Sequence, residues 1–228
     1  MHRTILRFAP ALLATATMSL MPVASATITT IWVGSGSQCD TSSLTSAISG
    51  ASLDAGDTTY IYVADDQTYG GQPLSLIDRN IVLTGGFAHC NDPSPVEHTQ
   101  IVAPHGQRAM LISSNAGTRR VTLGNLILQG GVSSGNGGGA SIAGQLDVTF
   151  SNVWVRDDSA TLGGGIYISG SDSEPATLRL VDGTRIGYSA DHYNTASEGG
   201  GVYCANALVS VEGAMIVYNT ASGNGGGL

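Results

Sequence analysis

Two adjacent carboxylates are the part of this sequence best suited to chemistry. Asp157 and Asp158 follow Arg156 directly. A pair of carboxylates at the right separation serves as acid and base in glycoside hydrolysis, so both are candidate catalytic residues. Asp158 has a second interpretation, because it occupies a position at which two later repeats have asparagine. There it is a bend residue.

Other catalytic and metal-binding motifs are missing from the sequence. The histidines after residue 26, which are His89, His98, His105 and His192, form no HExxH pattern, so no zinc site is predicted. Neither a Gly-x-Ser-x-Gly elbow nor a glycine-rich calcium nonapeptide occurs. The chain contains no lysine and no GxxxxGK[ST] phosphate loop. We therefore expect no cofactor and no metal.

Glycine triplets recur in the last part of the chain and define a repeat. Their first residues are separated by 26, 36 and 26 positions, and an apolar residue follows each triplet. Asp or Asn stands shortly before three of the triplets. The predicted turn residues are Gly137, Gly138, Gly139, Gly163, Gly164, Gly165, Gly199, Gly200, Gly201, Gly225, Gly226, Gly227, Asp158, Asn194 and Asn219.

Each repeat contains three short runs in which apolar and polar residues alternate, as in Leu146–Phe150. This alternation directs one set of side chains inward and the other outward. Three such strands in one unit cannot bury their apolar side alone, so successive units must stack. Glycine, asparagine and aspartate suit the bends because they adopt positive φ angles. The sequence predicts an all-β fold, a right-handed parallel β-helix or solenoid.

The repeats resemble those of the polymorphic outer membrane proteins. The matching elements are Gly-Gly followed by Ala140, Ile166, Val202 or Leu228, and the segment Ile216-Val217-Tyr218-Asn219. The family prefers Phe where Ile216 stands. The resemblance covers Gly137–Leu228 and implies a β-helix of the kind shared with pectin-lyase-like proteins. It also implies exposure at the cell surface and an adhesive role.

Residues 1–26 have the three parts of a secretory signal peptide. Arg3 and Arg7 precede an apolar stretch that is too short to span a bilayer, and Ala24-Ser25-Ala26 is a small-residue cleavage site. We expect an exported protein, secreted or associated with the outer membrane or cell surface, whose mature chain has no transmembrane segment.

The charge of the mature chain excludes one class of partner. Without Arg3 and Arg7, seven cationic side chains face seventeen acidic ones, a net charge of −10. Nucleic-acid binding is not expected, because phosphate contacts need clustered cations. Arg119-Arg120 is the one basic pair, predicted as a solvent-facing turn with acidic-sugar binding as the alternative.

Cysteine usage predicts one disulfide. Cys39 and Cys90 both lie before the repeats, and export implies an oxidising compartment, so we expect them to pair. Such a bond contributes roughly 2–4 kcal/mol by constraining the unfolded chain. Cys204 lies inside the repeats, where we expect a small buried side chain in place of Ile168; a partner beyond the C-terminus is the alternative.

Residues 27–100 are predicted to form an N-terminal cap and the first irregular coils. A short helix there would begin at a Thr41 or Ser42 cap and bury one face. Residues 101–228 are predicted to form the β-helix repeats. The chain stops just as a strand begins, so we expect the product to be truncated at its C-terminus; a partner that covers the last coil is the alternative.

Three functions are compatible with these features. The first is a non-catalytic, exported surface or secreted protein with an adhesin-like binding or structural role, whose partner is a host or cell-surface protein or a polysaccharide. The second is a polysaccharide-active enzyme resembling pectate lyases or polygalacturonases. The third is a truncated fragment without an independent function. One scaffold hosts many functions, so the fold does not decide among them.

Overall fold

The chain winds as a right-handed parallel β-helix. The computed structural model describes residues 25–171 and 173–228. Every pairing between its named strands is parallel. One short helix accompanies the strands. The predicted fold class is confirmed.

The elements follow one another in short segments separated by turns. The first half contains β1 (Ile28–Val33), α1 (Leu44–Gly50), β2 (Thr58–Ala64), β3 (Leu74–Ile77), β4 (Ile81–Phe87), β5 (Thr99–Val102) and β6 (Met110–Gln129). The second half contains β7 (Ala140–Arg156), β8 (Ser159–Leu162), β9 (Ile166–Ser169), β10 (Ala176–Val181), β11 (Arg185–Ile186), β12 (Thr195–Glu198), β13 (Val202–Ala205), β14 (Ala207–Glu212), β15 (Met215–Ile216) and β16 (Thr220–Ala221).

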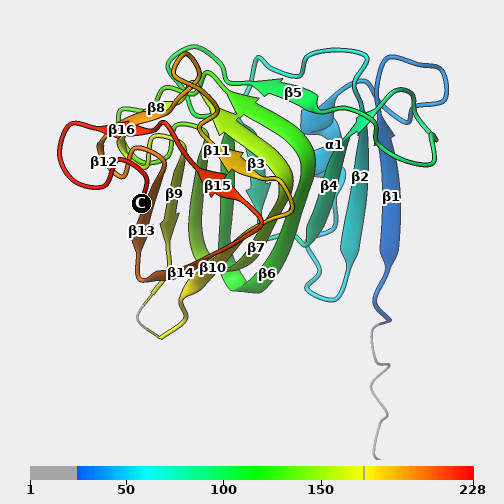
Figure 1. The fold of residues 1–228 in the computed structure, drawn as a ribbon. Helices are drawn as coiled ribbons and strands as arrows, with labels where there is room; N and C mark the ends of the chain where they lie inside the picture. The colour runs from blue at the N-terminus through cyan, green and yellow to red at the C-terminus, as the bar shows by residue number, and fades with distance from the viewer. Residues whose placement is uncertain (1–24, 172) are drawn as a thin grey trace, which may run out of the picture.

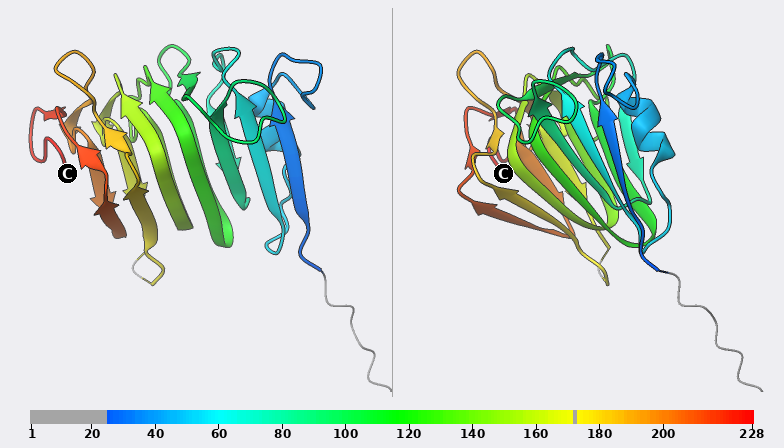
Figure 2. Two further views of the ribbon diagram at one scale, coloured as in Figure 1. Left: turned by 45° about the vertical axis from the view of Figure 1, so that its right-hand side comes forward. Right: turned by 90° about the vertical axis from the view of Figure 1, so that its right-hand side faces the viewer.

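Successive coils lie side by side along one axis, from β1 at one end to the last strands at the other (Figure 1, Figure 2). The main sheet has 13 strands, with β1-β2-β4-β6-β7-β10-β14 as its continuous path. A second, three-stranded sheet has the order β16-β12-β8. The main sheet continues across the proposed boundary at residue 100, because β4 and β5 both pair with β6.

Two strands are longer than the sequence predicted. The separate runs expected in each unit are joined in β6 and β7, whose parallel pairing shifts register between Ser114 and Arg119 and continues on both sides of a later bend. Asn125 and Asn152 lie at this bend with φ angles of 50° and 53°. The side-chain Nδ2 of Asn152 donates a hydrogen bond of 2.7 Å to Oδ1 of Asn125. Stacked asparagines thus let the backbone turn a corner while the hydrogen-bond ladder continues on both sides.

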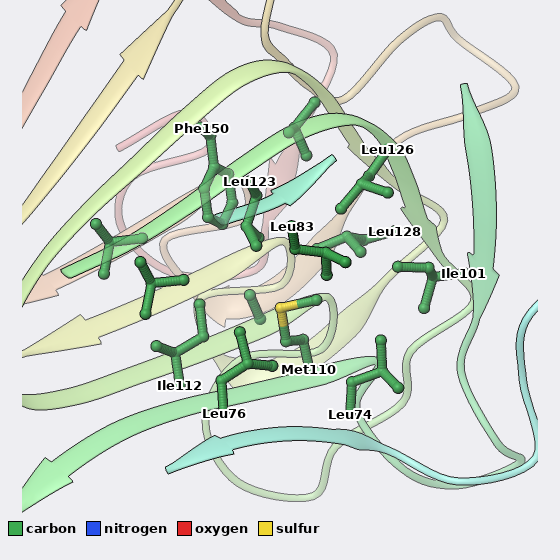
Figure 3. Packing of buried hydrophobic residues seen from close by; sticks show 14 of the residues in the cluster. Leu74, Leu76, Leu83, Ile101, Met110, Ile112, Leu123, Leu126, Leu128 and Phe150 are labelled. Atoms are coloured by element: carbon green, nitrogen blue, oxygen red, sulfur yellow. The ribbon is translucent and has the colours of Figure 1, made fainter. Parts of the chain in front are cut away.

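The inward-facing residues of all coils form one continuous apolar interior. In Figure 3, Leu83, Leu123 and Phe150 from β4, β6 and β7 project into the same enclosed space. These side chains have no exposed surface. In β10 fully buried positions alternate with partly buried or exposed ones, as period-2 strand geometry requires. Stacking therefore buries surfaces that one coil could not bury alone.

The helix takes the place of a strand in the first coil. The order β1-α1-β2 parallels β2-β3-β4, and α1 packs against β1, β2 and β3. The helix buries one face, as predicted, through Leu44, Ala47 and Ile48. The predicted cap at Thr41 or Ser42 is wrong by at least one position. Ser43 is the N-cap, because its side chain accepts the amide of Ser46 at 3.2 Å.

The predicted disulfide between Cys39 and Cys90 is present, whereas the environment expected for Cys204 is wrong. The disulfide joins segments 51 residues apart, with a Cα–Cα distance of 5.3 Å. Cys204 aligns with Ile168 in the strand register, as expected. Its side chain is nevertheless exposed, because no strand of a following coil covers β13 among the described residues.

Candidate functional site

Each position of a glycine triplet meets a different physical requirement. Gly163 has a φ of 67°, a conformation that favours glycine. A Cβ on Gly164 would lie 2.5 Å from the carbonyl oxygen of Gly200 on the next coil. A Cβ on Gly165 would lie 2.9 Å from the side-chain Nδ2 of Asn194. The triplet therefore allows the backbones of two neighbouring coils and one interior side chain to lie close together at a single corner.

Asp158, Asn194 and Asn219 lie above one another at the same bend of consecutive coils; we call this set the bend ladder. Oδ1 of Asn219 accepts a hydrogen bond from the amide of Asn194 at 3.2 Å. Oδ1 of Asn194 accepts one from the amide of Asp158 at 3.1 Å. The side-chain Nδ2 atoms of Asn194 and Asn219 donate to the carbonyl oxygens of Val155 (2.9 Å) and Ile186 (2.8 Å). The ladder thus binds backbone groups of the bends.

Asp158 is the first member of the bend ladder and is enclosed by protein. Its side chain is 1% exposed, and its Oδ1 accepts the amide of Gly131 at 2.7 Å. Its Oδ2 is buried without a hydrogen-bond partner. Burial raises the pKa of this carboxyl well above its ordinary value; the Gly131 amide acts in the opposite direction, and the charge of Asp157 raises the pKa further.

Asp157 faces the opposite way and lies on the outer surface. It has a φ of 61°, which turns the backbone between the two aspartates. Its Oδ2 lies 3.0 Å from Nδ1 of His192 and 3.8 Å from Nε of Arg156. The candidate catalytic carboxylates therefore do not share a site, since one is sealed in the interior and the other forms an ion pair outside.

Next to Asp157, the outer surface carries stacked rings and guanidinium groups. The members of this aromatic–arginine cluster are His98, Trp154, Arg156, Arg185, Tyr188 and His192. Parallel strand register places Arg185 of β11 beside Trp154 of β7. Three members, His98, Tyr188 and His192, come from segments before or after the strands, so the solenoid wall supports residues that loops supply.

Contacts within the cluster hold its side chains in place. The ring centroids of His98 and Trp154 are 4.3 Å apart, and those of Trp154 and Tyr188 are 4.9 Å apart. The guanidinium carbon of Arg185 lies 5.8 Å from the Trp154 centroid and 5.4 Å from that of Tyr188. That of Arg156 lies 5.8 Å from the Tyr188 centroid. Aromatic and cation–π contacts of this kind contribute roughly 0.5–1 kcal/mol each, so the cluster is held before a ligand arrives.

The Arg119-Arg120 pair does not form the solvent-facing turn that the sequence predicted. Both residues lie within β6, and Arg119 is only 5% exposed. Its Nε donates to the carbonyl oxygen of Asp78 at 3.0 Å. Arg120 projects outward, with its Nε 3.9 Å from Oδ2 of Asp147. Adjacent strand residues face opposite sides, so the pair cannot act as one basic site.

The sequence offered part of the signal for the aromatic–arginine cluster. The runs Val153-Trp154-Val155 and Arg185-Ile186-Gly187 occupy the same place in their repeats, but the register that sets Arg185 beside Trp154 comes from the strand pairing. Tyr188 and His192 lie near or within the extra residues of the 36-residue unit, where no other repeat provides a register. The pairing of His192 with Asp157, 35 positions away, therefore had no sequence signal.

Comparison with known proteins adds no assignment, because no protein-family model, curated protein or solved structure matches the chain. The described part of the chain contains no group of three or more His, Cys, Asp or Glu side chains placed to hold a metal ion. Within the same residues, no helix has the length and apolar character needed to cross a membrane.

Proposed function

We propose that this chain is an exported, non-catalytic β-helix protein with an adhesin-like role, at the cell surface or secreted. Its outer wall would bind a polysaccharide or a cell-surface protein. The observation that carries the proposal is the separation of Asp157 from Asp158. Acid–base glycoside hydrolysis needs two carboxylates that both reach the substrate, and Asp158 is 1% exposed.

The aromatic–arginine cluster supports a binding role. Aromatic residues and arginine are enriched at the centres of protein interfaces, where few residues contribute most of the binding energy. Trp154 and Tyr188 are half-buried and already stacked, so a ligand would not have to order them. We place the binding surface of this protein at the cluster.

Two further features support export and a surface location. The Cys39–Cys90 bond is of the kind that persists in oxidising compartments. The repeats resemble those of polymorphic outer membrane proteins, which implies display at a cell surface. The signal peptide predicted at residues 1–26 falls almost wholly outside the described residues.

Binding and turnover should be measured on the same preparation of the full chain. We expect retention on immobilised polygalacturonate or on fixed host cells, with neither reducing ends nor unsaturated products formed from polygalacturonate. Arg185→Ala should weaken retention at least tenfold. Arg179→Ala is the matched control, because Arg179 is exposed in β10 and makes none of the cluster contacts. Equal retention by both variants would contradict the proposed surface, and turnover would contradict the non-catalytic role.

One observation favours a second function, a polysaccharide-active enzyme. The two carboxylate oxygens of Asp157 lie 3.0 and 3.1 Å from Nδ1 of His192, and such a pair orients the other ring nitrogen for proton transfer. Product formation that His192→Ala abolishes and Asp158→Asn leaves intact would favour this function. Loss of turnover in Asp158→Asn would instead restore the predicted carboxylate pair.

A further inference from the structure

The bend ladder has an aspartate at a position where the next two coils have asparagine. Its acceptor bonds repeat from coil to coil: Asn219 accepts from the amide of Asn194, Asn194 from that of Asp158, and Asp158 from that of Gly131. Oδ1 of Asp158 therefore makes the bond that the carboxamide oxygen makes in the other two members. The second carboxyl oxygen is the atom that differs.

Two comparisons show that Oδ2 of Asp158 occupies the position of an amide nitrogen. A Cβ on the third glycine of the corner would lie 2.9 Å from Nδ2 of Asn194 at Gly165, and 2.6 Å from Oδ2 of Asp158 at Gly139. The corresponding distance to Nδ2 of Asn219, at Gly201, is 2.6 Å. The same corner geometry thus surrounds a hydrogen-bond donor in two coils and a carboxyl oxygen in the third.

The repeat also identifies the atom that this oxygen faces. Nδ2 of Asn194 donates to the carbonyl of Val155, and Nδ2 of Asn219 donates to that of Ile186. In the strand register Val155 pairs with both Ile186 and Leu128. The equivalent acceptor for Asp158 is therefore the carbonyl oxygen of Leu128.

A bare carboxylate oxygen directed at a carbonyl oxygen inside the protein would be repelled and unsolvated. Oδ2 is buried without a partner, and Asp158 does not line any of the five most pronounced surface hollows. A proton satisfies this geometry without additional space. We propose that Asp158 is a neutral carboxylic acid in the folded protein and donates a hydrogen bond from Oδ2 to the Leu128 carbonyl oxygen. This bond makes the stability of the bend depend on pH.

The nearest charge also favours the neutral form of Asp158. The groups that bond to or contact it from neighbouring coils, Gly131, Gly139 and Asn194, are uncharged. Asp157 is the adjacent charged group, and its negative charge opposes ionisation of Asp158. Arg156 and His192 pair with Asp157 on the outer surface and so offset part of that effect. Burial remains the largest cause of the raised pKa.

The consequence is a loss of stability as the pH rises. Above the ordinary aspartate pKa the unfolded chain releases this proton, while the folded chain keeps it. Between the pKa of Asp158 in the unfolded chain and its raised pKa in the folded chain, this group should increase the unfolding equilibrium constant about tenfold per pH unit. Asparagine at this position carries the donor permanently, so the contribution of this group to the pH dependence disappears.

The test is urea unfolding of the full chain from pH 5 to pH 8, for the unmodified protein, Asp158→Asn and the matched control Asp157→Asn. We expect Asp158→Asn to be more stable than the unmodified protein at pH 8. The logarithm of its unfolding equilibrium constant should rise less steeply with pH, by the contribution of one proton, whereas Asp157→Asn should keep the slope of the unmodified protein. Identical slopes for the unmodified protein and Asp158→Asn would overturn the proposal. An Asp158→Asn chain that fails to fold would also overturn it, because asparagine fits this corner in the two following coils.

A direct measurement on the unmodified protein complements the variants. The carboxyl carbon of Asp158, assigned in a carbon-13 NMR spectrum by its absence in Asp158→Asn, should keep the shift of a protonated acid at pH 6. A carboxylate shift at pH 6 that changes to the acid form only near pH 4 would refute the proposal.

Discussion

The side-chain Nδ2 of Asn194 donates to Oδ1 of Asn219 over 3.0 Å, and Asn194 has no exposed surface. This contact joins the bends of two coils whose strands already pair on both sides. Because the same side chain bonds the backbone of Asp158 and Val155, it links three coils at one point.

Asn194→Ala should therefore lower the free energy of unfolding by about 2–3 kcal/mol, because it leaves buried polar groups without partners. Asn224→Ala is the control, since Asn224 is exposed, and we expect a change within about 0.5 kcal/mol. Urea unfolding followed by circular dichroism measures both. Equal effects would mean that the ladder contact does not stabilise the bend.

The second glycine of a triplet should not tolerate even a methyl group. A Cβ at Gly164 would meet backbone oxygens of Gly200 and Thr195, which strand pairing holds in place. We expect Gly164→Ala to cost about 2–3 kcal/mol of stability in the same urea assay.

Gly50 provides the control for this substitution. It is the last residue of α1, and a Cβ there meets nothing within 4 Å. Gly50→Ala should stabilise the protein by roughly 0.5 kcal/mol, because glycine loses more conformational freedom on folding. A small effect at Gly164 would show that the coils can separate at the corner.

The disulfide should contribute about 2–4 kcal/mol to the free energy of unfolding, since it closes a long loop in the unfolded chain. Replacing both Cys39 and Cys90 by serine should lower stability by this amount, measured by thermal and urea unfolding. Cys204→Ser serves as the control, because Cys204 is exposed and unpaired. If reduction of the unmodified protein leaves its stability unchanged, this prediction is wrong.

Tyr69 should produce a late step in an alkaline titration. Its hydroxyl lies 3.3 Å and 3.2 Å from the carbonyl oxygens of Val33 and Ala64, and burial raises its pKa to about 12. The unfolded chain releases this proton near pH 10, so this group makes the folded state less stable as the pH rises from about 10 to about 12.

Tyrosinate absorbance tests this expectation. Tyr69→Phe should remove the step near pH 12 and cost about 1 kcal/mol at neutral pH, because a buried hydrogen bond is lost. Tyr218→Phe, at a residue that is 61% exposed, should leave that step in place. A step near pH 12 that persists in Tyr69→Phe would assign it to another side chain.

Much of the architecture was predictable because its signals are local. Alternation within a few residues defines strands such as β9, and the glycine triplets mark the corners within each unit. The limits of the strands were less predictable. Nothing near Asn125 or Asn152 in the sequence distinguishes a bend that ends a strand from one that lets β6 and β7 continue.

The surface cluster shows where local reasoning stops. His98, Trp154 and Tyr188 stack across segments that are far apart in the chain, and two of them lie outside the regular repeat. Their association depends on how the coils are placed along the axis. The alternation of apolar and polar residues within a strand does not predict which loop residues pack against the outer face of the sheet.

Asp157 and Asp158 show most clearly what the sequence determines and what the tertiary structure decides. Repeat spacing alone determined that Asp158 stands at a bend, since the bend position recurs with asparagine in two later units. Only the tertiary structure decided that Asp158 is sealed beneath a glycine corner while Asp157 pairs with His192 outside. The physical reason is that burial and charge pairing depend on the neighbouring coils, whose contacts stacking creates and a single unit of sequence does not contain.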